Sequence, residues 1–307
     1  MRTKPSRRDV LQLGGAVLAG VLLERASLRG AFDNTRREVF LGTDAFARSL
    51  AALDARADLR AGSILHIGHS THLLTVAGVR VLTDPWIYDP VFGALRHEHG
   101  LPADPSGLAT AEVLCLTHEH PDHADPAALA RLPRAARCLV GSARTAELAR
   151  AAGLVDVTLL EPWQSVQVRE LQITAVPALH DVPELGFVLR GADKSVYYAG
   201  DTREGPALAE IRARLSPRTA ILPVDAMHRR GAERMTMGPE EAILAARTLG
   251  VSQVMPSHAE TFLHDPVARA LLWEKADDAA NVFISRAAAE LPGVTCLHPG
   301  AGEIVAL

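Results

Sequence analysis

Residues 117–125 read THEHPDHAD and gather three histidines and three acidic side chains within nine positions. On a regular helix, residues two apart point about 200° away from each other, so His118 and His120 could not face one ion there. On a loop that leaves a strand they can converge, and Pro121 disfavours an early helix. Imidazole and carboxylate groups suit a borderline cation such as zinc, manganese or iron. The alternative, a histidine-rich surface turn, is disfavoured because the apolar run 112–117 leads straight into the motif.

A single loop cannot supply the ligands of two ions, so further donors are expected elsewhere. Three candidates each stand where an apolar run stops. His180 follows the run 171–177, Asp201 follows 194–200, and His258 ends 252–258. Each of these residues taken alone would more often be an ordinary polar loop residue. Together, they fit a site built at the ends of several strands.

The elements that must position these donors follow from hydrophobic periodicity. Short β-type runs predict strands, and helical spacing with Ser142, Gly153 and similar boundary residues predicts helices. Strands are expected at 64–68, 73–78, 79–84, 112–117, 171–177, 186–191, 194–200, 219–225 and 252–258, and helices at 142–153, 205–215, 238–250 and most of 265–290. Strands dominate early and mix with helices later, which predicts an α/β sandwich of two mostly β layers covered by helices.

The order of the motifs resembles one known family. The series His-x-His-x-Asp-His, then a lone histidine, then Gly-Asp-Thr, then a late histidine is similar to the metallo-β-lactamase fold superfamily of metal-dependent hydrolases. The resemblance covers residues 63–307 and implies a four-layer αββα sandwich. Residues 36–62 would form a lead-in helix before that domain.

The resemblance also implies the roles of the donors. His118, His120 and His180 would hold one divalent ion, and a second set would hold the other. That second set consists of Asp122, His123 and His258. Asp201 would bridge the two ions, with zinc as the first choice and manganese or iron as alternatives. Such a pair of ions lowers the pKa of a shared water towards about 7, and Asp122 would orient the resulting hydroxide.

Two longer segments resemble particular subgroups of the superfamily. HIGHSTHLLTVAGVRVLTDPW, together with MTMGPEEAILAA and PSHAETF, is similar to subgroups that contain L-ascorbate-6-phosphate lactonase and the phospholipase D enzymes acting on N-acyl-phosphatidylethanolamine. The chain departs from them at Asp225, where these relatives commonly have glycine, and in the short segment between His180 and Gly186. Both departures concern the substrate pocket rather than the metal ligands.

Four further residues are candidates for supporting or pocket roles. His69 and Asp84 lie in the opening hairpin and could orient a metal ligand, because ligands usually need such partners. His228 and His264 could border the pocket, although a basic surface turn and a residue at a helix start are the plainer interpretations.

The first 35 residues resemble an export signal. Arg7 and Arg8 precede an uncharged apolar run from Val10 to Leu23, which is short for a membrane span. This arrangement is similar to a twin-arginine (Tat) signal of bacteria and predicts a periplasmic or exported protein. Since no small-residue cleavage site follows, membrane anchorage through this run is an alternative.

Composition limits the functions that fit. The net charge of −4 provides no basic field for nucleic acid. The leading hypothesis is therefore a metal-dependent hydrolase that cleaves a phosphodiester or an ester or lactone of a small-molecule or lipid substrate. A nuclease of the same superfamily and a non-catalytic metal-binding protein on the same fold are the alternatives. The oligomeric state is not readable from the sequence.

Overall fold

Two seven-stranded sheets form the centre of the molecule. The computed structural model describes residues 38–39, 44–91, 95–98, 107–263 and 273–307. The first sheet has the order β20-β2-β3-β4-β7-β8-β9. Its strands, in that order, are Ile304–Ala306, Gly62–Gly68, Thr71–Val76, Val79–Thr83, Val113–Leu116, Arg137–Val140 and Val157–Leu159. The second sheet has the order β10-β11-β12-β13-β14-β16-β19. Its strands are Ser165–Val168, Leu171–Pro177, Leu185–Arg190, Ser195–Tyr198, Thr219–Pro223, Gln253–Ser257 and Thr295–Cys296.

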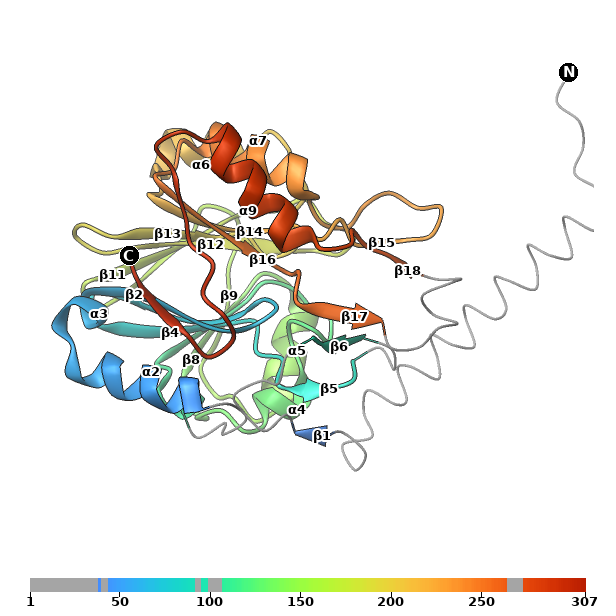
Figure 1. Ribbon diagram of the computed structural model, residues 1–307. Helices are drawn as coiled ribbons and strands as arrows, with labels where there is room; N and C mark the ends of the chain where they lie inside the picture. The colour runs from blue at the N-terminus through green and yellow to red at the C-terminus, as the bar shows by residue number, and fades with distance from the viewer. Residues whose placement is uncertain (1–37, 40–43, 92–94, 99–106, 264–272) are drawn as a thin grey trace, which may run out of the picture.

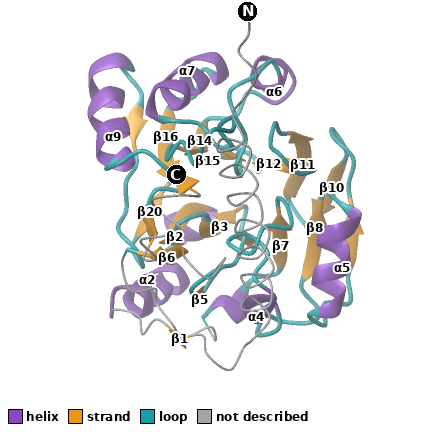
Figure 2. Cartoon of the chain, turned by 90° about the vertical axis from the view of Figure 1, so that its right-hand side faces the viewer, coloured by secondary structure: helices purple, strands orange, loops and turns teal. Residues whose placement is uncertain are grey.

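Helices cover the outer face of each sheet, so the molecule is the predicted four-layer αββα sandwich (Figures 1 and 2). The helices beside the first sheet are α2 (Asp44–Ala55), α3 (Ala57–Ala61), α4 (Pro126–Leu129) and α5 (Ala143–Ala151). Those over the second sheet are α6 (Ala207–Leu215), α7 (Pro239–Leu249) and α9 (Ala279–Glu290). In the described part of the segment 36–62, α2 and α3 are separate helices, where a single lead-in helix was expected.

Three apolar clusters hold these layers together. One lies between the two sheets and includes the fully buried Phe187 and Tyr198. Another packs the first sheet on its helices, and a third packs the second sheet against α6, α7 and α9. Because the parallel central strands are covered on both faces, their sequences are apolar throughout, as in VLCL of β7.

Local sequence explains where α7 begins and ends. Gly238 precedes the helix, Pro239 occupies its first turn, and the Glu241 carboxylate accepts a hydrogen bond from the Gly238 amide at 2.8 Å. The helix stops at Gly250, whose φ of 65° lies in the left-handed region that glycine tolerates.

Small two-stranded sheets complete the described chain. They pair β1 (Glu38–Val39) with β5 (Tyr88–Asp89), β6 (Leu95–His97) with β17 (Thr261–Leu263), and β15 (His228–Arg229) with β18 (Trp273–Glu274). Within the segment 265–290, expected to be mostly helical, α9 covers 279–290, whereas residues 273–274 form β18 because they pair with β15 from a distant part of the chain. Across the described ranges, no helix has the length and apolar character needed to cross a membrane.

The directions of the strands decide which edge of each sheet carries the candidate donors. In the first sheet β2 and β4 run the same way, and β4 is parallel to β7. In the second sheet β11, β13, β14 and β16 run the same way. The carboxyl ends of these strands therefore line one edge of each sheet. The antiparallel β12 begins at that edge, so residues just before it join the same region.

Candidate metal centre

Each predicted donor stands at a carboxyl end of one of these strands. The loop with His118, His120, Asp122 and His123 follows β7. His180 follows β11, Asp201 follows β13, and His258 follows β16. Within the described chain, these side chains form two groups, each of which could hold a metal ion.

The first group consists of His118, His120, His180 and Asp201, whose donor atoms all lie within 4.8 Å of one another. His180 Nε2 is 3.3 Å from His120 Nδ1, and His118 Nε2 is 3.9 Å from Asp201 Oδ2. His118 and Asp201 are buried, and the side chain of His180 is fully buried although its backbone is partly exposed. His120 is half-buried, so it gives this group its access towards solvent.

The second group consists of His69, Asp122, His123 and His258, again with donor atoms within 4.8 Å, and all four residues are buried. Asp122 Oδ2 lies 3.5 Å from His69 Nε2, 3.6 Å from His258 Nε2 and 3.9 Å from His123 Nε2. For comparison, nitrogen donors about 2.1 Å from a tetrahedral ion are about 3.4 Å apart.

Asp201 reaches both groups. Its Oδ1 is 3.1 Å from His123 Nε2, and its Oδ2 is 3.1 Å from His258 Nε2. The carboxylate thus belongs to the first group while it also contacts two histidines of the second. This is the position that a carboxylate shared by two ions would need.

The residues predicted to have supporting or pocket roles lie in different places. His69, expected only to support a ligand, is placed by the structure among the donors of the second group. His228 lies outside both groups: it is half-buried in β15, with Nε2 2.9 Å from Glu274 Oε2. His264 lies outside the described residues, as do residues 1–35 with their twin-arginine-type segment.

Asp84, which directly follows β4, forms hydrogen bonds that hold several of these side chains in place. Its Oδ2 lies 2.8 Å from His123 Nδ1 and accepts a hydrogen bond from Thr117 Oγ1 at 2.7 Å. Because the Thr117 hydroxyl donates to Asp84, it accepts from His118 Nδ1 at 2.9 Å. Both histidines are then held with Nε2 towards the centre, the orientation that metal ligands need. Tyr198 completes the network with its hydroxyl 2.6 Å from Asp84 Oδ2.

Asp225 contacts His258 by charge rather than by a hydrogen bond. It is fully buried just after β14, and its Oδ2 lies 3.0 Å from His258 Nδ1 without hydrogen-bond geometry. Its Oδ1 accepts hydrogen bonds from Thr236 Oγ1 and the Met227 amide. Asp225, which stands where the relatives commonly have glycine, was expected to affect the substrate pocket, but it contacts the candidate ligand His258 instead. Its position directly after an apolar run is the feature of the sequence that could have indicated this role.

Glu184 was missed by the sequence analysis. It directly precedes β12, and its Oε1 accepts a hydrogen bond from the Asp201 amide at 2.7 Å and lies 3.4 Å from His118 Nδ1. Burial raises the pKa of this carboxyl to about 8, and the nearby Asp201 charge adds to the effect although His180 opposes it. No spacing rule marked Glu184, because its role depends on the antiparallel course of β12.

The two groups differ in protonation. Burial lowers the pKa of His120 to about 3 and that of His118 well below its usual value, and neighbouring histidines add to the effect. Burial also disfavours charge on His123 and His258, but carboxylates that include Asp201 outweigh it and raise both pKa values well above the usual range. His118 and His120 of the first group are therefore neutral imidazoles, whereas His123 and His258 of the second group hold positive charge against the nearby carboxylates.

Unpaired buried atoms test whether a metal fits. His118 Nε2, His123 Nε2, His258 Nε2, Asp122 Oδ1 and Asp201 Oδ1 are buried without a hydrogen-bond partner among the described residues. Buried polar atoms nearly always have partners, so a set of orphaned donors facing one region requires an explanation. Nitrogen and carboxylate donors are the chemistry that divalent transition ions prefer. The residues therefore fit a metal centre.

Comparisons with known proteins agree with this fold and chemistry. Residues 79–259 match the model of the beta-lactamase superfamily domain. A UPF0173 metal-dependent hydrolase of Korarchaeum cryptofilum is 31% identical over 205 residues, which cover 65% of this chain and 83% of that protein. A second one, from Methanopyrus kandleri, is 29% identical over 211 residues, covering 65% and 84%.

Solved structures share the fold at lower identity. A possible metal-dependent hydrolase of Veillonella parvula has a TM-score of 0.67 at 19% identity and covers 80% of this chain and 99% of its own. An isothiocyanate hydrolase from Delia radicum gut bacteria has a TM-score of 0.64 at 21% identity and covers 80% and 98%.

The chain belongs to the beta-lactamase superfamily. Within it, the chain is a metal-dependent hydrolase of the UPF0173 family.

Proposed function

We propose that the chain is a two-metal hydrolase that cleaves a phosphodiester or an ester or lactone. His118, His120 and His180 would hold one divalent ion, and Asp122, His123 and His258 would hold a second. Zinc is the first choice for both, with manganese or iron as alternatives. The observation that carries the proposal is Asp201, whose carboxylate lies between the two groups at 3.1 Å from His123 and His258.

Two divalent ions in these positions would supply Lewis acidity and lower the pKa of a water molecule towards neutrality. Attack at phosphorus and attack at a carbonyl carbon both need this chemistry, so the donor set serves either substrate class. The net charge of −4 and the absence of a basic field favour a small-molecule or lipid substrate over nucleic acid.

The protein side chains have distinct tasks in this proposal. Asp122 Oδ1 is buried and unpaired among the described residues, so it is free to accept a hydrogen bond from the attacking water and orient it. Glu184 fixes the Asp201 backbone, and Asp84 fixes His118 through Thr117 and His123 directly. The half-buried His120 places the first group beside the entering substrate.

Hydrolysis assays on matched substrates test the proposal. The full-length protein is reconstituted with Zn²⁺, Mn²⁺ or Fe²⁺ and assayed on an activated phosphodiester and on a lactone. His118→Ala is run beside it, with His228→Ala as a control outside both groups. We expect turnover of one substrate class that falls to background in His118→Ala and stays within about twofold of wild type in His228→Ala. Turnover that survives in His118→Ala, or none on either class, would contradict the proposal.

We further propose that residues 1–35 export the folded protein through the twin-arginine pathway, with retention at the membrane as the alternative. The support is the Arg7-Arg8 pair before the apolar run Val10–Leu23. Fractionation of bacteria that express the chain, with Arg7→Lys/Arg8→Lys as the comparison, tests this. Export that is unchanged in the double variant would count against a twin-arginine signal.

A further inference from the structure

His69 occupies an unusual backbone position at the end of β2. The pairing of β2 with β3 changes register between His66 and Gly68, and bulges of this kind re-aim side chains next to functional sites. His69 itself has a φ of 54°, in the left-handed region that non-glycine residues rarely adopt. His258 has a φ of 61°, and its amide donates a hydrogen bond to the His69 carbonyl at 3.3 Å. Two histidines from different sheets are thus held in strained conformations against each other, a feature that clusters at functional sites.

Among the residues that the structure describes, the His69 ring has no polar partner outside the second group. It is fully buried, with its ring centroid 3.9 Å from that of His258 and the Trp86 ring edge-on at 5.1 Å. Neither ring nitrogen has a hydrogen-bond partner among the described residues, and Nε2 points at Asp122 Oδ2 from 3.5 Å. An imidazole always carries a donor or acceptor on each nitrogen, and burying both without partners is costly. An ion at the centre of the group would satisfy Nε2.

We propose that His69 is a direct ligand of the second metal position. This inference rests on the two-metal centre proposed above and changes its composition. The second position then has four donors of its own, namely His69, Asp122, His123 and His258, and shares Asp201 with the first. The first position has three imidazoles and the shared carboxylate. The second position is therefore the richer of the two and suits ions that accept five or six ligands, such as Mn²⁺, Fe²⁺ and Co²⁺, as well as Zn²⁺.

A merely structural His69 would pack against His258 without touching the ion. Spin coupling separates the two roles, because it is transmitted only through a metal–ligand bond. The full-length protein is labelled with ¹⁵N in all histidines and loaded with ¹¹³Cd²⁺, a spectroscopic substitute for zinc. We expect two cadmium ions per chain and six imidazoles with a nitrogen coupled to cadmium, from His69, His118, His120, His123, His180 and His258.

Two variants show which histidine gives rise to which nitrogen–cadmium coupling. In His69→Gln, the second cadmium should bind about 100-fold more weakly or worse, since loss of even an indirect supporting partner costs 10–100-fold, while the three couplings of the first group remain. His72→Gln is the matched control. His72 is equally buried in the neighbouring strand, but it lies outside both groups and its Nδ1 bonds to the Ser70 carbonyl. That variant should lose one histidine signal and no cadmium coupling. If either variant misfolds, the count in the wild-type protein still decides.

The outcomes distinguish this inference from the proposed function. Five couplings with two bound ions and an uncoupled His69 would overturn the inference and leave the two-metal hydrolase intact. Six couplings in a protein that hydrolyses neither substrate class would support the inference and refute the proposed reaction. One bound cadmium or none would overturn both.

Discussion

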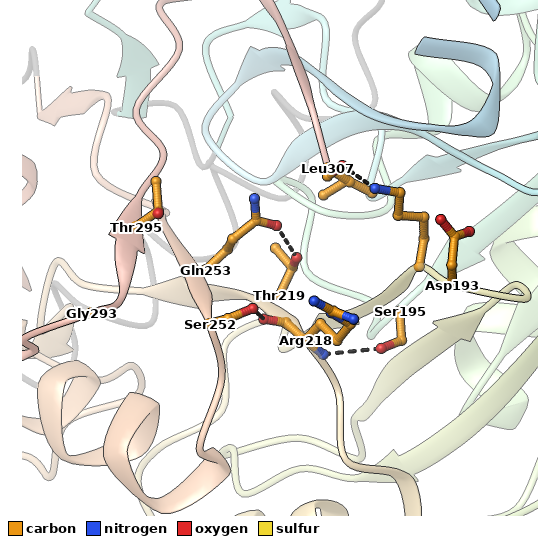
Figure 3. A pocket seen from close by; sticks show the side chains of 10 residues that line it. Asp193, Ser195, Arg218, Thr219, Ser252, Gln253, Gly293, Thr295 and Leu307 are labelled. Atoms are coloured by element: carbon orange, nitrogen blue, oxygen red, sulfur yellow. Dashed lines mark hydrogen bonds between the residues drawn. The ribbon is translucent and has the colours of Figure 1, made fainter. Parts of the chain in front are cut away.

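The two ends of β13, β14 and β16 carry different surfaces. At their carboxyl ends lie Asp201, Asp225 and His258, among buried donors that lack hydrogen-bond partners within the described chain. Their amino ends line a cavity of about 460 Å³ (Figure 3). This cavity lies at the opposite end of these strands from the candidate metal ligands.

The polar groups of that cavity largely satisfy one another. Thr219 Oγ1 donates to Gln253 Oε1 at 2.7 Å, the Arg218 amide donates to Ser195 Oγ at 3.0 Å, and Lys194 Nζ contacts the Leu307 carbonyl (Figure 3). Unpaired donors at the other end point to a ligand, whereas paired groups here point to structural support. Unsatisfied buried chemistry, rather than volume, therefore locates the site.

A second contrast lies within the centre. His118 and His120 of the first group are neutral and His120 is half-buried, whereas His123 and His258 of the second group are protonated and buried beside Asp84 and Asp225. The first group is therefore suited to meet the substrate, and the buried second group is suited to hold an ion firmly.

The largest effect is expected for Asp201→Asn, which removes the charge that both groups share. Hydrolysis should fall on the order of 1,000-fold, as for loss of a central electrostatic group, and metal content should fall in both positions. Turnover assays and elemental analysis of the same preparation measure this. A variant that keeps both ions and at least a tenth of the activity would show that the groups do not depend on Asp201.

A smaller and more selective effect is expected for Asp225→Asn. Removal of this charge beside His258 Nδ1 should weaken metal binding at the second position about 10–100-fold, as for other residues that orient a ligand. The first position should keep its affinity. Calorimetric titration with Zn²⁺ resolves the two steps, and equal weakening of both would contradict the division into two groups.

Metal uptake should release protons unequally. His123 and His258 have pKa values well above the usual range, so both are protonated near neutral pH without metal and must lose about two protons when their Nε2 atoms bind an ion. His118 and His120 are already neutral and should release none. As pH rises through the raised pKa values, the release should decline to zero.

Titrations in buffers of different ionisation enthalpy count these protons. Glu184→Gln is the control, because burial raises the pKa of Glu184 to about 8 and its proton could otherwise contribute. Equal release in both binding steps of this variant would refute the difference in protonation.

The smallest effect is expected at the amino-end cavity. Lys194→Ala should change metal content and hydrolysis by less than about twofold. Lys194 Nζ contacts the Leu307 carbonyl, at the end of the sheet opposite to the candidate metal ligands. Steady-state kinetics measure this. A tenfold loss would show that the cavity takes part in function.

Much of the fold could be predicted because apolar runs report burial directly. The predicted strand 171–177 coincides with β11, and the predicted helix 238–250 with α7 to within a residue at each end. The strands β8, β9 and β10 were not predicted. β8 is a run of only four residues, and the residues of β9 and β10 are mostly half-exposed or exposed, so their patterns are weak. The two-residue β18 depends wholly on β15, which no local pattern reveals.

Some residues of the candidate site could likewise be predicted from the sequence, and others could not. The seven predicted donors could be found because each follows a strand, and the structure brings all seven into the two groups. Glu184 could not be found, since it enters through the start of an antiparallel strand. The place of His69 among the donors also could not be found, because it depends on a register shift and a left-handed backbone.

The amino-acid sequence alone establishes the kinds of donor, their order along the chain and the strands that end beside them. These properties are local, since they depend on residue type and on hydrophobic periodicity. The grouping of the seven donors and the position of Asp201 were expected from the resemblance, whereas the place of His69 beside His258 depends on the packing of the two sheets, and no local pattern encodes that distance. The contacts of Asp84 and Asp225 with His123 and His258 likewise depend on the folded chain.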